Sequence, residues 1–243
     1  MNLPKLSEVD RVSFSLSVAT GLYGISFGAL AIAAGLAAWQ AITLSLLMFT
    51  GGSQFAFIGV IAGGGTPIAA LSAASLVGVR NAIYGMQTRL YVRPQGWRKL
   101  LAIHVSIDES IAVSTSQKDP DLVKRGFWMT GLGVYLFWNL CTVIGVYLGN
   151  SIGDPKVWGL DGAAVAAFIG LLWPRLVSRE PVALAIVCAA VTIIAVPFVP
   201  AGIPIIIAAF VAGIWSWRCF VNEKNKSAVL VDAQEAVDLV EPR

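Results

Sequence analysis

Long stretches without a charged residue alternate with short polar segments along the chain. The longer stretches match the roughly 20 apolar residues that a helix needs to cross the hydrocarbon core. The apolar blocks are Ser13 to Ala38, Ala41 to Gly63, Pro67 to Thr88, Gly126 to Gly149, Gly162 to Trp173, Val182 to Val199 and Ile203 to Trp217. The pattern predicts an all-α, polytopic transmembrane helical bundle of about seven spans.

Composition supports a protein of the lipid bilayer. Hydrophobic residues make up 57% of the chain and charged residues 13%, about half the charge of an ordinary soluble domain. Residues 1–221 therefore form a single transmembrane domain, and the polar tail 222–243 is predicted to be a disordered cytosolic extension. The net charge of +3 is too small and too scattered to indicate a nucleic-acid partner. The cysteines show no metal-binding spacing, so no metal or other cofactor is predicted.

The segment Leu100 to Gln117 is long enough for a short span but contains ionisable residues. If it does not cross, most Lys and Arg residues fall on one side, in agreement with the positive-inside rule. The sequence thus predicts that this segment stays on the cytoplasmic side of a bacterial inner membrane. With seven spans, the N-terminus lies outside and the C-terminus inside.

Three spans before the central loop would give two halves of opposite orientation, which is typical of inverted-repeat transporters. Thr20-Gly21-Leu22 and Thr130-Gly131-Leu132 show a weak internal similarity. An inverted repeat is therefore possible.

Several glycines are spaced for close packing of helices. Gly24 and Gly28, Gly59 and Gly63, and Gly145 and Gly149 form GxxxG pairs. We expect each pair to mark a helix interface.

The second block contains adjacent glycines followed by two polar residues, Gly51, Gly52, Ser53 and Gln54. This combination predicts a break in the helix, because unwound backbone is tolerated at membrane depth only where it is buried in protein or lines a wet cavity. Free amides there can hold a carboxylate, and free carbonyls an ammonium group. The alternative is a glycine kink with Gln54 bonded to a neighbouring helix.

Arg80 is the one charge inside the third block, with Asn81 beside it and Tyr84 one turn further on. An intramembrane cation is costly unless it is paired or faces water. Arg80 is thus a candidate for a substrate carboxylate, with Asn81 and Tyr84 nearby. The alternatives are pairing with Asp108 or Glu109, or a side chain that snorkels to the interface.

His104, Asp108 and Glu109 are candidates for proton exchange. In a continuous helix His104 and Asp108 share one face. His104 is the only histidine in the chain, and histidine titrates near neutral pH. No metal site or nucleophile motif accompanies them, so an enzyme is not predicted. The alternative is an interfacial helix with solvated charges.

The same residues carry a family resemblance. Phe27-Gly28, Gly51-Gly52-Ser53-Gln54-Phe55, Arg80-Asn81-Ala82-Ile83-Tyr84-Gly85 and Asp108-Glu109-Ser110-Ile111-Ala112 resemble the ordered motifs of AzlC-type large subunits of bacterial branched-chain amino-acid exporters. The resemblance implies proton-driven export of leucine, isoleucine, valine and methionine. It also implies a small companion membrane subunit of the AzlD type.

These observations predict an alternating-access exporter. Residues 51–54 would face Arg80, Asn81 and Tyr84 across a cavity, and His104, Asp108 or Glu109 would exchange protons. The alternative is a passive channel or scaffold subunit of a membrane complex.

Overall fold

The computed structural model describes residues 7–152, 157, 169–170, 172–173, 176–219 and 221. The chain divides into two compact units, Met1–Pro174 and Arg175–Arg243, which are described separately here. Most of the predicted block 162–173 and the predicted tail 222–243 lie outside the described residues.

The described residues form helices and no strands, which confirms the all-α prediction. The helices are α1 (Glu8–Ala33), α2 (Ala38–Leu47), α3 (Gly51–Ala62), α4 (Pro67–Gly78), α5 (Arg80–Tyr91), α6 (Arg98–His104), α7 (Asp108–Thr115), α8 (Pro120–Ile152) and α10 (Arg179–Ala195). Three helical stretches in this part of the chain are long and apolar enough to cross a membrane, namely Glu8–Ala33, Pro67–Tyr91 and Pro120–Ser151.

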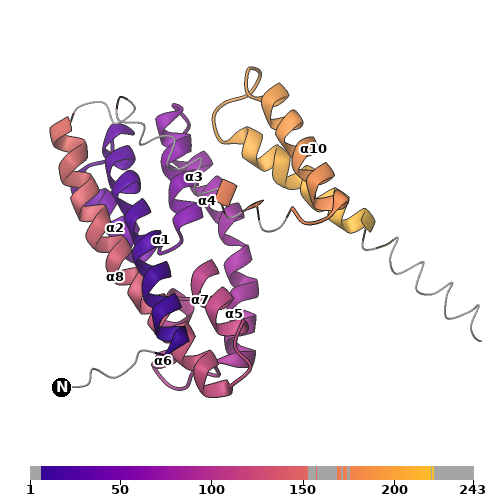
Figure 1. The fold of residues 1–243 in the computed structure, drawn as a ribbon. Coiled ribbons are helices and arrows are strands. Elements are labelled where there is room, and N and C mark those ends of the chain that lie inside the picture. The colour runs from indigo at the N-terminus through magenta and orange to yellow at the C-terminus, as the bar shows by residue number, and fades with distance from the viewer. Residues whose placement is uncertain are drawn as a thin grey trace, which may run out of the picture. The chain divides into compact units, whose positions relative to one another are not determined.

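Helices α1 and α8 lie side by side and run in the same direction (Figure 1). Small residues allow the two backbones to approach closely. A Cβ atom added to Gly24 would lie 2.5 Å from the carbonyl oxygen of Trp138, and one added to Gly149 would lie 3.0 Å from Cα of Ala29. The Gly24/Gly28 and Gly145/Gly149 pairs are therefore confirmed as interface positions. The prediction for Gly59 is wrong, because nothing lies within 4 Å of a Cβ added there.

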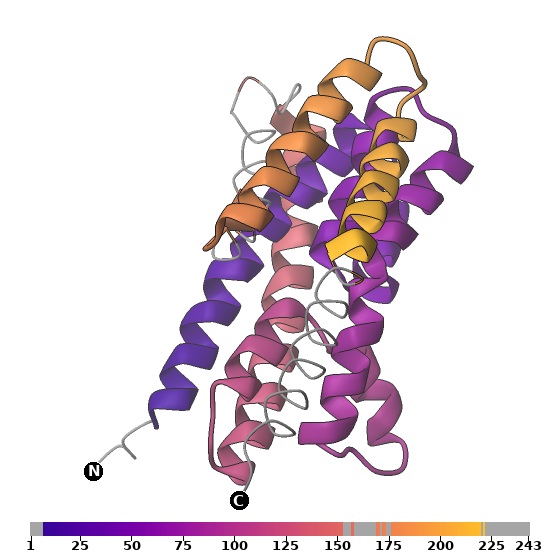
Figure 2. The same ribbon diagram turned by 90° about the vertical axis from the view of Figure 1, so that its right-hand side faces the viewer.

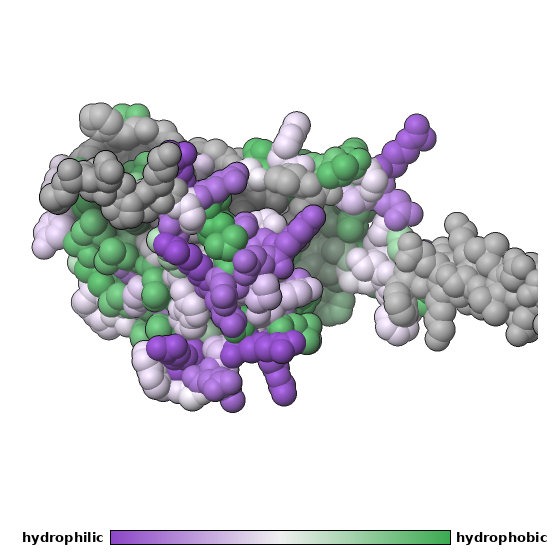
Figure 3. All heavy atoms as spheres, turned by 60° about the horizontal axis from the view of Figure 1, so that its bottom comes forward, coloured by the Kyte–Doolittle hydropathy of each residue, from purple (hydrophilic) through white to green (hydrophobic). Residues whose placement is uncertain are grey.

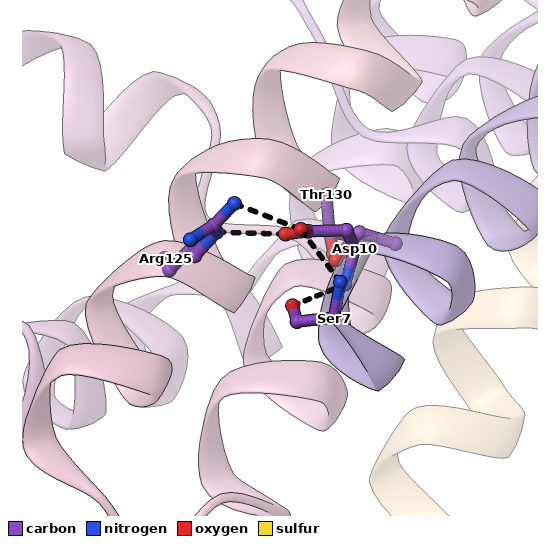
Figure 4. Close-up of polar contacts among 5 residues, drawn as sticks. Ser7, Asp10, Arg125 and Thr130 are labelled. Atoms are coloured by element: carbon purple, nitrogen blue, oxygen red, sulfur yellow. Dashed lines mark hydrogen bonds and ion pairs between the residues drawn. The ribbon is translucent and has the colours of Figure 1, made fainter. Parts of the chain in front are cut away.

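An ion pair joins α1 and α8 near their N-terminal ends (Figure 4). Arg125 donates to the carboxylate of Asp10 from Nε at 2.7 Å and from Nη2 at 2.8 Å. The Asp10 carboxylate also accepts from the backbone N–H of Ser7, which caps α1. One turn further along, Thr130 donates to the hydroxyl of Ser13 at 3.0 Å. These contacts set the register of the two helices.

The predicted span Ala41 to Gly63 is two short helices, so the block is broken as predicted but turns back instead of crossing the unit. Helix α2 runs back along α8, where Ser45 donates to Asn139 at 2.7 Å. The chain breaks at Met48–Thr50 and turns, so that the start of α3 lies beside the end of α4. The break precedes the two glycines, because Gly51 to Gln54 form the first turn of α3. This pair of helices enters the bundle and returns to the same end.

Helices α4 and α5 together run from that end to the other (Figure 2). Thr66 caps α4 by accepting from the N–H of Ala69, and Pro67 fits its first turn because the amide it lacks would have no partner there. The regular helical hydrogen bonding is interrupted at Val79, whose N–H donates to the carbonyl oxygen of Leu76, immediately before Arg80.

Helices α6 and α7 form a second pair that enters and returns, now from the opposite end. Their connection contacts the middle of α8, since a Cβ atom added to Gly131 would lie 2.9 Å from the carbonyl oxygen of Val105. The end of α7 returns to the start of α8, where Val113 lies against Gly126. Within the unit the segment turns back instead of running to the other end, and its place on the cytoplasmic side stays a prediction. It is also broken, so His104 and Asp108 lie on different helices.

The start of α1 lies at the same end of this unit as the start of α8, as the Asp10–Arg125 pair shows. The predicted placement of the N-terminus opposite residues 89–125 is thus wrong, because residues 41–63 do not cross. The repeat based on Thr20 and Thr130 is not inverted either, since α1 and α8 run in parallel. The two broken pairs, α2–α3 and α6–α7, enter the unit from opposite ends.

The second unit contains α10 and a helix over Ile203–Cys219, joined by a turn with Gly202 at φ +94°. The Cys188 thiol lies 3.7 Å from the carbonyl oxygen of Ala208, so the two helices contact each other. They match the predicted blocks Val182 to Val199 and Ile203 to Trp217.

Cysteine labelling distinguishes the fold in which α2 and α3 enter the bundle and return from one in which residues 41–63 form a straight span. We expect Ala37→Cys and Gly65→Cys, in a chain with its native cysteines replaced by serine, to react from the same side of the membrane, and Gln95→Cys from the opposite side. A straight helix over 41–63 would place Ala37 and Gly65 on opposite sides, and that result would contradict the fold.

Two glycine substitutions test the α1–α8 interface. Gly145→Ala directs a methyl group at the backbone of Ile25, so we expect it to destabilise the protein by about 1–3 kcal/mol. Gly59→Ala is the matched control, and its better helix propensity should leave stability unchanged or slightly higher. Melting in detergent measures both. An equal melting temperature for the two variants would argue against close packing at Gly145.

Candidate functional site

The two helix breaks meet near the midpoints of α1 and α8 and border a cavity of about 240 Å³. Phe49, in the first break, lies beside His104, at the end of α6, with ring centroids 5.9 Å apart. The lining of the cavity includes Leu16, Thr20, Tyr23, Phe49, Thr50, Gly51, Gly52, Phe55, Arg80, Ile107, Asp108, Glu109, Val134 and Trp138. The volume is near the lower end for small-molecule pockets, roughly 300 Å³ and above, and suits a ligand of few heavy atoms.

The start of α3 contributes backbone rather than side chains to the cavity. Thr50 precedes the helix without a side-chain cap bond, so the first-turn amides point to a region without a capping group. Gly51 packs against the Trp138 ring, and a Cβ atom added to Gly52 would lie 2.7 Å from Nη2 of Arg80. Both glycines therefore give a ligand and the arginine access to the helix end, where the dipole favours negative charge.

Arg80 and Asp108 form an ion pair at the cavity wall. Nη1 of Arg80 lies 2.9 Å from Oδ2 of Asp108, and the side chains are 29% and 16% exposed. Tyr84, one turn along α5, donates its hydroxyl to Oδ1 of the same carboxylate. Because Arg80 is paired with Asp108, the alternative that its side chain reaches out to the membrane interface is wrong. The pair also ties α5 to α7 at the level of the cavity.

Glu109 is the second carboxylate on the cavity. Its oxygen accepts from the hydroxyl of Thr20 at 3.4 Å. Among the described residues, no basic side chain lies within 4.0 Å of it. Glu109 thus lacks a paired cation, while its neighbour Asp108 has one.

Aromatic and aliphatic side chains form the rest of the wall. Phe27 lies behind it and stacks on Trp138, with ring centroids 6.2 Å apart. Phe55 meets the Trp138 ring edge-on at 6.1 Å. The cavity therefore combines a largely apolar surface with one cation, two carboxyl groups and a helix N-terminus.

The structure brings part of the predicted site together. Gly51, Gly52, Arg80, Asp108 and Glu109 line the cavity. Each was a candidate on sequence grounds, and their roles toward a ligand remain predictions.

The other candidates lie away from the cavity lining. The Gln54 amide donates to the carbonyl oxygens of Met48 at 2.8 Å and Leu44 at 3.3 Å, so it closes the end of α2. Ser53 faces Gly78 of α4. Asn81 is half-buried outside the lining, and Tyr84 acts through Asp108.

His104 packs between aromatic rings, with ring centroids 5.9 Å from Phe49 and 5.3 Å from Tyr135. It does not line the cavity. The expectation of one helical face shared by His104 and Asp108 is wrong, because the chain breaks at Val105–Ile107.

Sequence reasoning missed Thr20, Tyr23, Phe55 and Trp138 as cavity residues. Threonine and aromatic residues are common in apolar helices, so their residue types alone do not mark them as cavity residues. Their role depends on which faces of α1, α3 and α8 meet, and this is decided by the tertiary packing.

The described residues contain no group of His, Cys, Asp and Glu side chains suited to a metal ion. The chemistry that this cavity offers is recognition of a small molecule that carries both a positive and a negative charge and an apolar part.

Comparison with known proteins identifies the family. The model of the AzlC protein family matches residues 15–152, more than half of the chain. The chain belongs to the AzlC family. The matched region covers nearly all of α1 to α8, and so the whole cavity wall named above.

Two relatives show the same similarity. The chain is 28% identical to the branched-chain amino acid transport protein AzlC of Bacillus subtilis over 148 residues, which are 60% of this chain and 58% of that protein. It is 25% identical over 162 residues to an uncharacterized membrane protein of Haemophilus influenzae, covering 65% and 66% of the two chains. The chain thus aligns with less than two thirds of the length of either relative. No solved structure matches it.

These findings make the protein a membrane protein of a transport family. The AzlC region coincides with the unit that contains the two broken helix pairs.

The Arg80–Asp108 pair gives a direct test of the cavity wall. Arg80→Ala leaves the Asp108 carboxylate near Glu109 without its cation, so we expect a loss of roughly 3 kcal/mol in stability and a lower yield. The double variant Arg80→Ala with Asp108→Ala should recover most of the melting temperature, and Lys118→Ala, an exposed basic position, should have no effect. A double variant no more stable than Arg80→Ala would argue against the pair.

Proposed function

We propose that this protein exports branched-chain amino acids, because the polar groups and the apolar wall of the cavity match a zwitterion with an aliphatic side chain. The single observation that carries the proposal is the joint presence of Arg80, Glu109 and the α3 N-terminus on one small, largely apolar cavity. The name of the Bacillus subtilis relative supports the same substrate class.

The substrate carboxylate would bind at the first turn of α3, beside the Arg80 guanidinium. Gly51 and Gly52 leave room for it, and the helix dipole and the arginine both favour negative charge there. The ammonium group would face Glu109, with Asp108 held in place by Arg80 and Tyr84. The aliphatic side chain would pack against Val134, Phe55 and Trp138.

Glu109 supports the proposal of proton coupling. A carboxylate without a paired cation in a largely apolar cavity is stabilised either by a proton or by the substrate ammonium group. Both occupy the same carboxylate, so they bind in competition. Competition at one group would link outward movement of substrate to inward movement of a proton. This supports Glu109, in preference to His104, as the group that exchanges protons.

The alternative is a passive channel or scaffold subunit. Such a subunit has no need for a buried arginine and two carboxyl groups at a cavity, given their cost in a membrane. The ion pair of Arg80 with Asp108 and the unpaired Glu109 therefore favour a transporter.

The resemblance to AzlC-type large subunits supports two further parts of the proposal. One is a small companion membrane subunit of the AzlD type. The other is multi-pass placement in the bacterial inner membrane, with residues 89–125 on the cytoplasmic side, because basic residues concentrate there.

Reconstitution in proteoliposomes tests this function. We expect a pH gradient to drive leucine transport by the wild-type protein, and leucine to bind more weakly as the pH falls, since protons compete for Glu109. Glu109→Gln should abolish gradient-driven transport and make the residual binding independent of pH. Glu8→Gln, an exposed carboxylate at the start of α1, is the control and should behave as wild type.

Leucine flux without any dependence on the pH gradient would indicate a channel. Absence of flux and of binding, with and without the companion subunit, would indicate a scaffold. Either result would overturn the proposal.

A further inference from the structure

A second cavity lies between α5 and α6, at the end of the unit where α1 begins. Its volume is about 550 Å³, and the described residues of its lining include Arg89, Arg93 and Lys99 but no acidic residue. Thr88 and Ala102 are buried at its floor. The exporter function proposed above makes no use of this cavity.

The basic side chains of this cavity have no carboxylate to neutralise them. None of the three forms an ion pair with a described residue. The sequence contains no Asp or Glu between Asp10 and Asp108, so α5 and α6 carry no acidic residue at all. Three like charges around one cavity repel one another unless an anion lies between them.

Arg93 is held in place by its backbone. Its φ of +52° lies in the left-handed region, which non-glycine residues rarely adopt. The backbone N–H of Arg93 donates to the carbonyl oxygen of Thr88 at 3.1 Å, and its side-chain Nε donates to that of Leu90 at 3.1 Å. These bonds hold the side chain at the cavity rim.

Exposed apolar and aromatic side chains flank the basic cavity. Trp97 is 72% exposed and Leu100 75% exposed, and Tyr91 and Leu90 are also exposed. Tryptophan and tyrosine are enriched where a membrane protein meets the headgroup layer. Figure 3, which brings this end of the molecule forward, shows hydrophilic side chains gathered in the middle with hydrophobic ones around them.

We infer that this cavity binds the phosphate headgroup of an anionic phospholipid. Arg89, Arg93 and Lys99 meet the phosphate, and the acyl chains lie along the neighbouring apolar side chains. Basic pockets between helices at the membrane surface bind anionic headgroups in this way. The exposed aromatic and aliphatic surroundings favour a lipid over a free phosphate, which has no use for them.

Lipid binding to the purified full-length protein tests the inference. We expect phosphatidylglycerol added to detergent solution to raise the melting temperature and to remain bound in native mass spectra, whereas phosphatidylcholine does neither. Inorganic phosphate and glycerol phosphate at equal concentration should have little effect. Arg89→Gln, Arg93→Gln and Lys99→Gln should each weaken phosphatidylglycerol binding roughly fivefold, and the triple variant should lose the shift.

The matched control removes the same charge from the same end. Arg11, Lys118 and Lys124 are exposed and lie outside the cavity lining, so their joint replacement by Gln should keep the lipid effect. Equal loss in both triple variants would mean unspecific attraction and overturn the site. Equal protection by inorganic phosphate would assign the cavity to a soluble anion and overturn the lipid assignment. If the cavity triple variant melts early without lipid, the single variants give the same comparison.

Discussion

Backbone amides and carbonyls cannot be left without partners in hydrocarbon, and the α1–α8 unit is arranged around that constraint. Two helices break near the middle of the bundle, at Met48–Thr50 and Val105–Ile107. Both breaks are enclosed by protein. Gln54 donates to carbonyls at the end of α2, and the Ser110 hydroxyl serves the second break by accepting from Ile107 and donating to Val105.

The close contact of α1 with α8 supports this enclosure. These helices are the longest in the described part of the chain, and their small residues allow backbone contact along most of their length. Their lower ends are held by the Asp10–Arg125 pair. Together they provide a rigid wall against which the shorter, broken helices pack, in keeping with the role of small residues in membrane bundles.

The two carboxyl groups at the cavity, Asp108 and Glu109, have different polar partners. Asp108 pairs with Arg80 and accepts from Tyr84, whereas Glu109 accepts from the hydroxyl of Thr20 and forms no ion pair with a described residue. Two adjacent carboxyl groups thus have different partners because successive residues of α7 point in different directions. This difference gives one carboxylate a structural role and leaves the other for a ligand or a proton.

The sequence by itself determined the helical membrane class, the polar points inside the apolar blocks and the family resemblance, because these depend on composition and local order. It also predicted that residues 100–117 stay on one side of the membrane. Only the tertiary structure decided that residues 41–63 turn back, that His104 and Asp108 belong to different helices, and that Thr20 and Trp138 meet Glu109 and Gly51 at one cavity. An apolar segment of span length satisfies hydropathy whether it crosses or returns, and only packing against other helices determines which.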